Sequence, residues 1–153
     1  IYTRQMLQFA GINLEAKTDA DRKLMAEVQS ALLNFDFWPI RRMAGDAAAF
    51  FEDLKGHNAA FFGHIREPHA IAKFKELMGR IGVPCVVVRV DRFDTNPVTN
   101  NVADLSVDET TYDYTIVNKG SLGDLFVECA KFARFIHEGT NDDHIRKDHP
   151  AVA

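Results

Sequence analysis

The sequence is poor in the features that are typical of secreted proteins, of membrane-spanning proteins and of proteins stabilised by a structural metal. Its 153 residues include two cysteines, Cys85 and Cys129, and neither belongs to a CxxC pair, so we expect two buried, reduced thiols. No apolar run reaches the roughly 18 to 20 residues that a membrane-spanning helix needs, and no signal peptide is visible. A net charge of −4 argues against a nucleic-acid or membrane surface as the main partner. These absences predict a soluble, cytoplasmic protein.

Familiar catalytic motifs are absent as well. The sequence holds no GxSxG elbow, no HExxH, no GxGxxG and no GxxxxGK[ST], and its six histidines have no metal-ligand spacing. These gaps disfavour a serine hydrolase and a histidine-based metal centre, so we predict no metal ligands in this chain.

What is present is an ordinary globular composition, with 46% apolar and 26% charged residues, which is enough to bury a core. We expect one domain over residues 1–139 and a loose polar tail over 140–153.

Periodic apolar residues and capping signals predict the helices. Thr18 is placed to cap a helix with Asp21 at its third position, and Pro68 suits a first helical turn. The last helix starts at the cap Ser121 and is expected to bury one face made of Leu122, Leu125, Phe126, Cys129, Phe132 and Ile136. The expected helices are Tyr2–Phe9, Thr18–Asn34, Asp46–Lys55, Pro68 up to Gly82, and Ser121 up to Gly139.

Three apolar runs have strand length: Ala59–Ile65, Val83–Val90 and Tyr112–Val117. Val83–Val90 is nearly all β-branched, which is typical of a strand buried on both faces. The polar stretch Asp91–Ser106 reads as a loop. Strands that alternate with helices predict an α/β fold with a mostly parallel sheet and helices on both faces.

Basic and amide side chains follow the predicted strands, and ligands of open α/β sheets bind outside the carboxyl ends of strands. Arg66 follows the first strand, and its guanidinium suits a phosphate; the alternative is a surface ion pair with the adjacent Glu67. Arg89 and Arg92 end the second strand and could clamp a transferring phosphoryl group. The alternative is a solvated loop in which nearby aspartates neutralise both arginines.

Two further segments are candidates. Asn118, Lys119 and Gly120 form a turn after the third strand, where backbone amides could face a base or a phosphate; a plain strand-to-helix connection is the alternative. Arg4 could contact an acceptor phosphate, or could be an ordinary surface residue of the first helix.

A cluster of aromatic residues supports a different kind of function. These side chains could pack in the core, or they could form a surface that binds another protein. Their exposure would favour a noncatalytic interaction module. The cluster comprises Phe35, Phe37, Trp38, Phe50 and Phe51.

Three stretches together resemble the later part of P-loop nucleoside and deoxynucleoside monophosphate kinases. Tyr2–Gly11 resembles the family's Arg-x-x-Leu-Gln-x-x-Gly helix near the acceptor site. Phe61–Phe74, with its Arg66-Glu67-Pro68, is similar to the strand and "REPxxI" helix of the substrate side. Tyr112–Leu122 resembles the last strand and the "N-x-G-S/T-L" turn.

This resemblance implies a nucleotide-binding P-loop-kinase-like domain that uses ATP and Mg²⁺. Arg4 and Arg66, with Glu67, would face the acceptor; Arg89 and Arg92 would act as lid-type arginines. Asn118–Gly120 would lie near the base. Phosphoryl transfer depends on positioning and charge neutralisation, which these side chains supply. A nucleotide sensor and a homodimer remain open alternatives.

The family's opening strand, glycine-rich phosphate loop and lysine have no counterpart here. The resemblance places that strand between Ala59–Ile65 and Val83–Val90, so its loss should leave backbone unpaired. The chain also begins Ile1-Tyr2-Thr3 without methionine, which fits an N-terminally truncated kinase. A degenerate, noncatalytic relative is the alternative. We expect little or no kinase activity from this chain alone.

Overall fold

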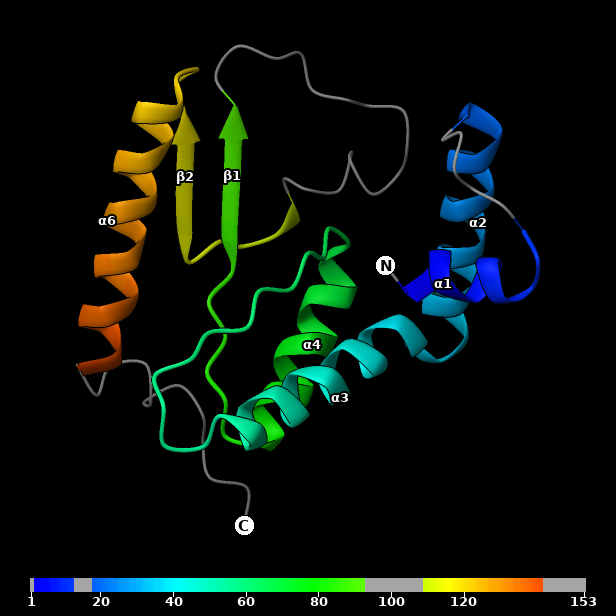
Figure 1. Ribbon diagram of the computed structural model, residues 1–153, viewed down its shortest axis with the longest axis horizontal. Helices are drawn as coiled ribbons and strands as arrows, with labels where there is room; N and C mark the ends of the chain where they lie inside the picture. Colours follow the sequence, from blue (N-terminus) through cyan, green and yellow to red (C-terminus); the bar gives the residue numbers. More distant parts are fainter. Residues whose placement is uncertain (1, 13–17, 93–108, 142–153) are drawn as a thin grey trace. The chain divides into compact units, whose positions relative to one another are not determined.

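The computed structural model describes residues 2–12, 18–92 and 109–141 (Figure 1). The chain packs as two compact units. We call the part up to Val83 the N-terminal unit and the part from Pro84 the C-terminal unit. Each has its own secondary structure and is described by itself; the expectation of one domain over residues 1–139 stays a prediction.

The N-terminal unit consists of helices joined by short connections, with α1 against α2, α2 against α3, and α3 against α4. The capping box at the start of α2 is confirmed. The N–H of Asp21 donates to Thr18 Oγ1 at 3.2 Å, and the N–H of Thr18 donates to Asp21 Oδ2 at 2.8 Å, which satisfies two amides that the first turn leaves unpaired. The helices are α1 (Tyr2–Phe9), α2 (Asp19–Asp36), α3 (Trp38–Asp53) and α4 (Pro68–Arg80).

A sharp turn at Phe37 separates α2 from α3. Phe37 has φ 50° and ψ 29°, a left-handed conformation that bulky residues rarely adopt. The prediction that the next helix starts at Asp46 was wrong, because α3 already begins at Trp38. Pro39 does not interrupt α3. An N–H in the first helical turn has no hydrogen-bond partner within the helix, so the N–H that proline lacks is not needed there.

The core of the N-terminal unit lies where α2, α3 and α4 meet. Leu33, Ile40 and Ala70 are its buried members, one from each helix. Further apolar side chains pack around them and complete the cluster, which we call the three-helix cluster. The surrounding residues are Phe37, Ile65, Phe74 and Leu77.

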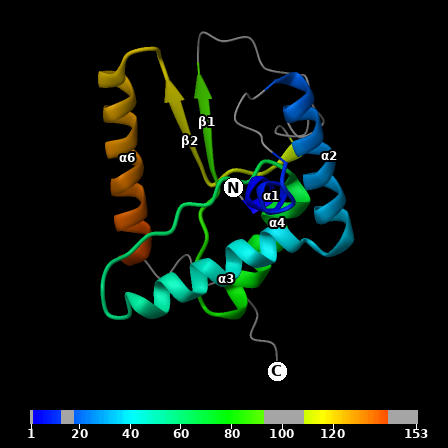
Figure 2. The ribbon, with the colours of Figure 1, turned by 45° about the vertical axis from the view of Figure 1, so that its right-hand side comes forward.

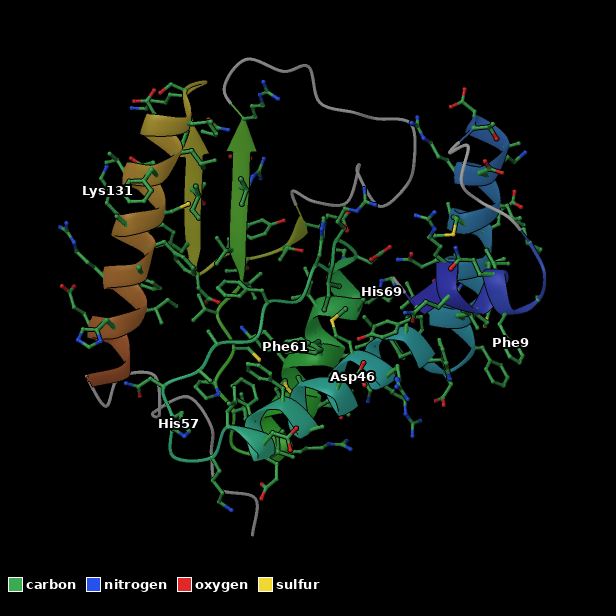
Figure 3. The ribbon with its side chains drawn as sticks, in the orientation of Figure 1. Phe9, Asp46, His57, Phe61, His69 and Lys131 are labelled. Atoms are coloured by element: carbon green, nitrogen blue, oxygen red, sulfur yellow. The ribbon has the colours of Figure 1, made fainter. Side chains whose placement is uncertain are left out.

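The predicted strand Ala59–Ile65 was wrong: this stretch is irregular. Phe61, labelled in Figure 3, packs its ring edge-on against Phe50 of α3 at 5.8 Å between centroids, while Phe62 is largely exposed. A strand exists only when another strand accepts its backbone hydrogen bonds. No described residue offers such a partner to this stretch, so its apolar composition alone does not make it a strand.

Tyr2 ties α1 to α3 through a hydrogen bond. Its hydroxyl donates to Asp46 Oδ2 at 2.8 Å; Asp46 lies on α3 in Figure 3. Burial, and then this bond to a carboxylate, raise the pKa of Tyr2 above its ordinary value of 10.0. The neutral phenol is therefore the form that the fold favours.

This raised pKa predicts a pH dependence. The stabilisation that Tyr2 supplies should be fully present below pH 10.0 and be lost as the pH rises through the higher pKa of the folded protein. An alkaline titration followed by phenolate absorbance should contain a late component that ionises above pH 10.0. Tyr2→Phe should remove that late component. If the late component survives in Tyr2→Phe, the assignment is contradicted.

The C-terminal unit contains β1 (Val88–Arg92), β2 (Tyr114–Asn118) and α6 (Leu122–Asn141). The two strands pair in parallel, and Val90 lies opposite Ile116. The predicted parallel arrangement is thus confirmed for these strands. Both views show α6 running alongside β2 (Figures 1 and 2), and α6 packs against it.

The expectation that Val83–Val90 is a strand buried on both faces was wrong in two respects. Pairing begins only at Val88, and the side chain of Val90 is 64% exposed. Among the described residues, β1 pairs with β2 alone, and the helix that packs on this sheet covers β2. The outer side chains of β1 therefore meet solvent. Asp91 and Arg92 of the predicted loop belong to β1, and its residues 93–106 lie outside the described residues.

The buried face of α6 is narrower than predicted. Tyr114 of β2 contacts the rings of Phe132 and Phe135, at 5.2 and 5.0 Å between centroids. Leu122 is instead 85% exposed and Phe126 76% exposed. The rings of Phe132 and Phe135 lie against β2, while Leu122 and Phe126, which were predicted to share the buried face, are exposed.

Both cysteines are free, as expected, but they are not buried: Cys85 is half-buried and Cys129 is exposed. Within residues 2–12, 18–92 and 109–141, no helix is both long enough and apolar enough to span a membrane. The predicted polar tail starts inside α6, which reaches Asn141; residues 142–153 lie outside the described part.

Candidate functional site

Arg66 and Glu67 form the corner that leads into α4. Arg66 is exposed, and Glu67 is the N-cap residue of the helix in an extended conformation, with φ −73° and ψ 125°. The Glu67 side chain does not cap its own helix. Instead, Gln29 Nε2 of α2 donates to Glu67 Oε1 at 3.3 Å. The corner thus presents a cationic side chain beside a carboxylate that another helix holds.

Gln29 did not emerge from the sequence as a candidate. The sequence of a helix does not indicate which distant residue a polar side chain will bond, and the partner of Gln29 lies 38 positions away. One signal was available: Gln29 lies four residues before the apolar Leu33, so both share one face of α2. A glutamine on the core-facing side of a helix needs a polar partner, because a buried amide without one is costly.

Arg4 lies on α1, in the same N-terminal unit. Its Nε is buried, and among the described residues this atom has no hydrogen-bond partner. An arginine N–H without an acceptor costs free energy. Arg4 Nε is therefore a buried donor that stays unsatisfied among the described residues.

In the C-terminal unit, the parallel pairing brings two predicted site segments to one edge. Arg92 and Asn118 are register partners at the carboxyl ends of β1 and β2. Asn118 Oδ1 accepts from the N–H of Gly120 at 3.0 Å, and Gly120 has φ 117°, which is open to glycine but not to other residues at low cost. Lys119, between them, is exposed.

The turn leads straight into α6. Ser121 Oγ accepts from the N–H of Asp124 at 3.0 Å, and the Ser121 hydroxyl donates to Asp124 Oδ2 at 2.6 Å. The predicted serine cap is confirmed. Strand, turn and capped helix follow one another within the few residues that a tight strand-to-helix connection requires.

Arg89 has a different environment from Arg92. Its Nε donates to Asp91 Oδ1 at 2.6 Å, and its guanidinium lies 5.7 Å from the ring centroid of Tyr112. Because side chains alternate along a strand, Arg89 and Arg92 point to opposite faces of β1. The strand does not bring these two guanidinium groups together, and Asp91 neutralises Arg89 as the alternative interpretation anticipated.

The metal-ligating side chains of the described residues form no cluster. Within them, no group of three or more histidine, cysteine, aspartate or glutamate side chains is placed to hold a metal ion. The chain also has no glycine-rich phosphate loop with its lysine, the element that cradles the β- and γ-phosphates in such kinases. The side chains that remain suit a single phosphate group.

Comparison of the chain with family models, with curated proteins and with solved structures found no match.

Proposed function

We propose that this chain is a nucleotide-binding domain of the phosphotransferase type that binds the acceptor, a nucleoside monophosphate. The observation that carries the proposal is the shared carboxyl edge of β1 and β2. There Arg92 lies opposite Asn118, and the Gly120 turn enters the N-terminus of α6. Parallel α/β sheets bind their ligands at this edge, where a cation and oriented backbone amides attract phosphate.

The N-terminal unit holds cationic groups of its own, which are candidates for binding phosphate separately from the sheet edge. Arg66 is exposed at the start of α4, and Arg4 carries a buried Nε that lacks an acceptor among the described residues. Both belong to the stretches that resemble the acceptor side of monophosphate kinases. A phosphate dianion would supply the acceptors that guanidinium groups prefer.

The proposal for this chain is binding of the acceptor and not turnover. ATP and Mg²⁺ belong to the reaction that the resemblance implies, and the residues that would hold them are not in this sequence. Binding of a monophosphate needs neither, because arginine and backbone donors neutralise and orient the phosphate directly.

Calorimetric titration of nucleoside monophosphates into the intact chain tests the proposal. Arg66→Ala should weaken binding at least about tenfold, as expected for loss of a charge-assisted phosphate contact. Arg41→Ala is the matched control: Arg41 is also exposed in the N-terminal unit, pairs with Asp36 at 2.8 Å, and belongs to none of the predicted site segments. It removes the same charge and should leave the affinity unchanged.

Two results would contradict the proposal. If no monophosphate binds, the phosphate roles of Arg4, Arg66 and Arg92 fall together. If Arg41→Ala weakens binding as much as Arg66→Ala does, the arginines act only through net charge, and Arg66 forms no specific site. Arg92→Ala, measured in the same way, tests the sheet edge.

A noncatalytic interaction module is the second candidate, and the exposure of aromatic residues favours it. Phe35 is 87% exposed, and Trp38 is exposed too, although Phe37 packs against the three-helix cluster. Exposed aromatic residues are typical anchors of protein interfaces. Sedimentation of the chain alone measures whether a homodimer forms; loss of that dimer in Phe35→Ser, with no nucleotide binding, would favour this function.

A further inference from the structure

β1 is an edge strand of the small sheet in the C-terminal unit. Among the described residues it pairs with β2 alone, and β2 lies between β1 and α6 in both views of the ribbon (Figures 1 and 2). The side chain of Val90, in the middle of β1, is 64% exposed. An edge strand has a row of backbone N–H and C=O groups on its outer side, and this row can bind a further strand.

The backbone groups of Val88 and Val90 lie on this outer side. Val87, just before the strand, directs its own groups toward the β2 segment. Its N–H donates to Asp113 Oδ2 at 2.6 Å, and its C=O accepts from the N–H groups of Asp113 and Tyr114 at 2.9 and 3.2 Å. Successive residues of a strand direct their backbone groups to opposite sides. Val88 and Val90, one and three positions later, therefore direct theirs away from β2.

The charged side chains of β1 have a self-complementary order. Arg89 and Asp91 stand on either side of Val90 in the strand, and they share one face because side chains alternate. When two copies of β1 align antiparallel with Val90 opposite Val90, Arg89 of each copy lies opposite Asp91 of the other. Opposite charges that face each other across two strands stabilise the pairing, and like charges destabilise it.

The hydrogen-bonding pattern selects the same register. In an antiparallel pair, residues that exchange hydrogen bonds alternate with residues that do not, and the side chains of the second kind lie closer together. The outward backbone groups of Val90 suit a hydrogen-bonded pair with Val90 of a second copy. Arg89 and Asp91 then occupy the positions where cross-strand side chains are closest. Backbone and charges thus favour one and the same alignment.

We propose that the outer edge of β1 binds a second copy of this chain, antiparallel and with two-fold symmetry about Val90. This inference goes beyond the proposed function and does not depend on it. A two-fold dimer joins the same patch of both subunits, so the patch must be self-complementary. Arg89 Nε donates to Asp91 Oδ1 within the chain at 2.6 Å. A guanidinium has five N–H donors and a carboxylate two acceptor oxygens, so these side chains pair both within a chain and across the axis.

Sedimentation of the full chain over a concentration series measures the dimer. A strand of five residues makes a small interface, so the mass should rise toward that of two chains at high concentration and fall on dilution. Arg89→Asp and Asp91→Arg should each weaken this association at least about tenfold, because like charges then face each other on both sides of the axis. Phe35→Ser, in the N-terminal unit, is the control and should dimerise as wild type does.

An equimolar mixture of the two charge variants makes the sharpest test. The Arg89→Asp chain carries two acidic side chains beside Val90, and the Asp91→Arg chain carries two basic ones. Their antiparallel pairing restores both cross-strand ion pairs, so the mixture should form a heterodimer although each variant alone stays monomeric. Neither variant keeps the ion pair within its own chain. A purely structural role of that pair therefore cannot produce the recovery.

Val90→Cys, with both native cysteines replaced by alanine, gives an answer even if a charge variant does not fold. The Cα atoms of a hydrogen-bonded antiparallel pair lie about 5.5 Å apart, which is within the span of a disulfide. Mild oxidation should therefore yield a covalent dimer on a non-reducing gel. Ala133→Cys, at an exposed position of α6, is the control in the same background and should stay monomeric.

Heterodimer formation in the mixture, or a cross-link specific to Val90→Cys, supports the inference. A wild-type chain that stays monomeric at every concentration overturns it. A dimer that survives both charge reversals, or folded charge variants that do not associate when mixed, overturn it as well. A dimer that is lost in Phe35→Ser and kept in the β1 variants is formed by the aromatic residues, and β1 is then not the interface.

Discussion

Replacing Leu33 with alanine is expected to destabilise the N-terminal unit by about 2 to 5 kcal/mol. Leu33 is 3% exposed and joins the three-helix cluster, in which each of α2, α3 and α4 contributes one fully buried residue. Truncation removes buried apolar surface and leaves a cavity that a cluster this small cannot refill. Because a small domain has a total stability of about 5 to 15 kcal/mol, the loss is a large fraction of the whole.

The measurement is urea unfolding followed by tryptophan fluorescence. Trp38 is the single tryptophan of the chain and begins α3 beside the cluster, so the signal reports on the N-terminal unit. Phe35→Ala is the matched control: it lies on the same helix, removes a larger side chain and is 87% exposed, so the change should stay within about 0.5 kcal/mol. Equal losses in both variants would contradict the assignment of the core.

The second large effect is expected in the C-terminal unit. Ile116→Ala should destabilise it by about 2 to 5 kcal/mol, because Ile116 is 6% exposed in the middle of β2, the strand that α6 covers. A two-stranded sheet is marginal without packing on one face. The loss should appear as faster hydrogen exchange at the amides of β2 and α6.

Val90→Ala is the control for this position. Val90 is the register partner of Ile116, so both variants shorten a β-branched residue at the same level of the sheet. Val90 is 64% exposed, and its loss should change the free energy of unfolding by no more than about 0.5 kcal/mol. If Val90→Ala speeds exchange as much as Ile116→Ala does, β1 is covered to the same extent as β2.

The candidate site was predictable in part. The sequence placed Asn118–Gly120 in a turn between a strand and a capped helix, because Asn, Gly and Ser have local hydrogen-bonding and backbone preferences that need no distant partner. It also placed Arg66 just before a helix that begins at Pro68. Gln29 was missed, since its hydrogen bond to Glu67 joins residues that meet only when α2 packs near α4.

The predicted clamp made of Arg89 and Arg92 is an example of a pattern that the sequence alone could not interpret. Their spacing of three suits a helix or a turning loop, where both could face one ligand, but within a strand it directs them to opposite faces. Asp91 and Tyr112 then engage Arg89. Whether two residues at a given spacing face the same side depends on the backbone conformation. Here the strand extends two residues beyond the predicted end at Val90.

Local features of this protein were therefore set by the sequence itself: the capping box at Thr18, the serine cap at Ser121, the proline start of α4, and the glycine-ended turns. Each depends on contacts within a few residues. Tertiary structure alone decided which apolar runs became strands and which faces were buried. Ala59–Ile65 is irregular and has no partner strand among the described residues, and α6 leaves Leu122 and Phe126 exposed, because burial and backbone pairing are supplied by distant segments.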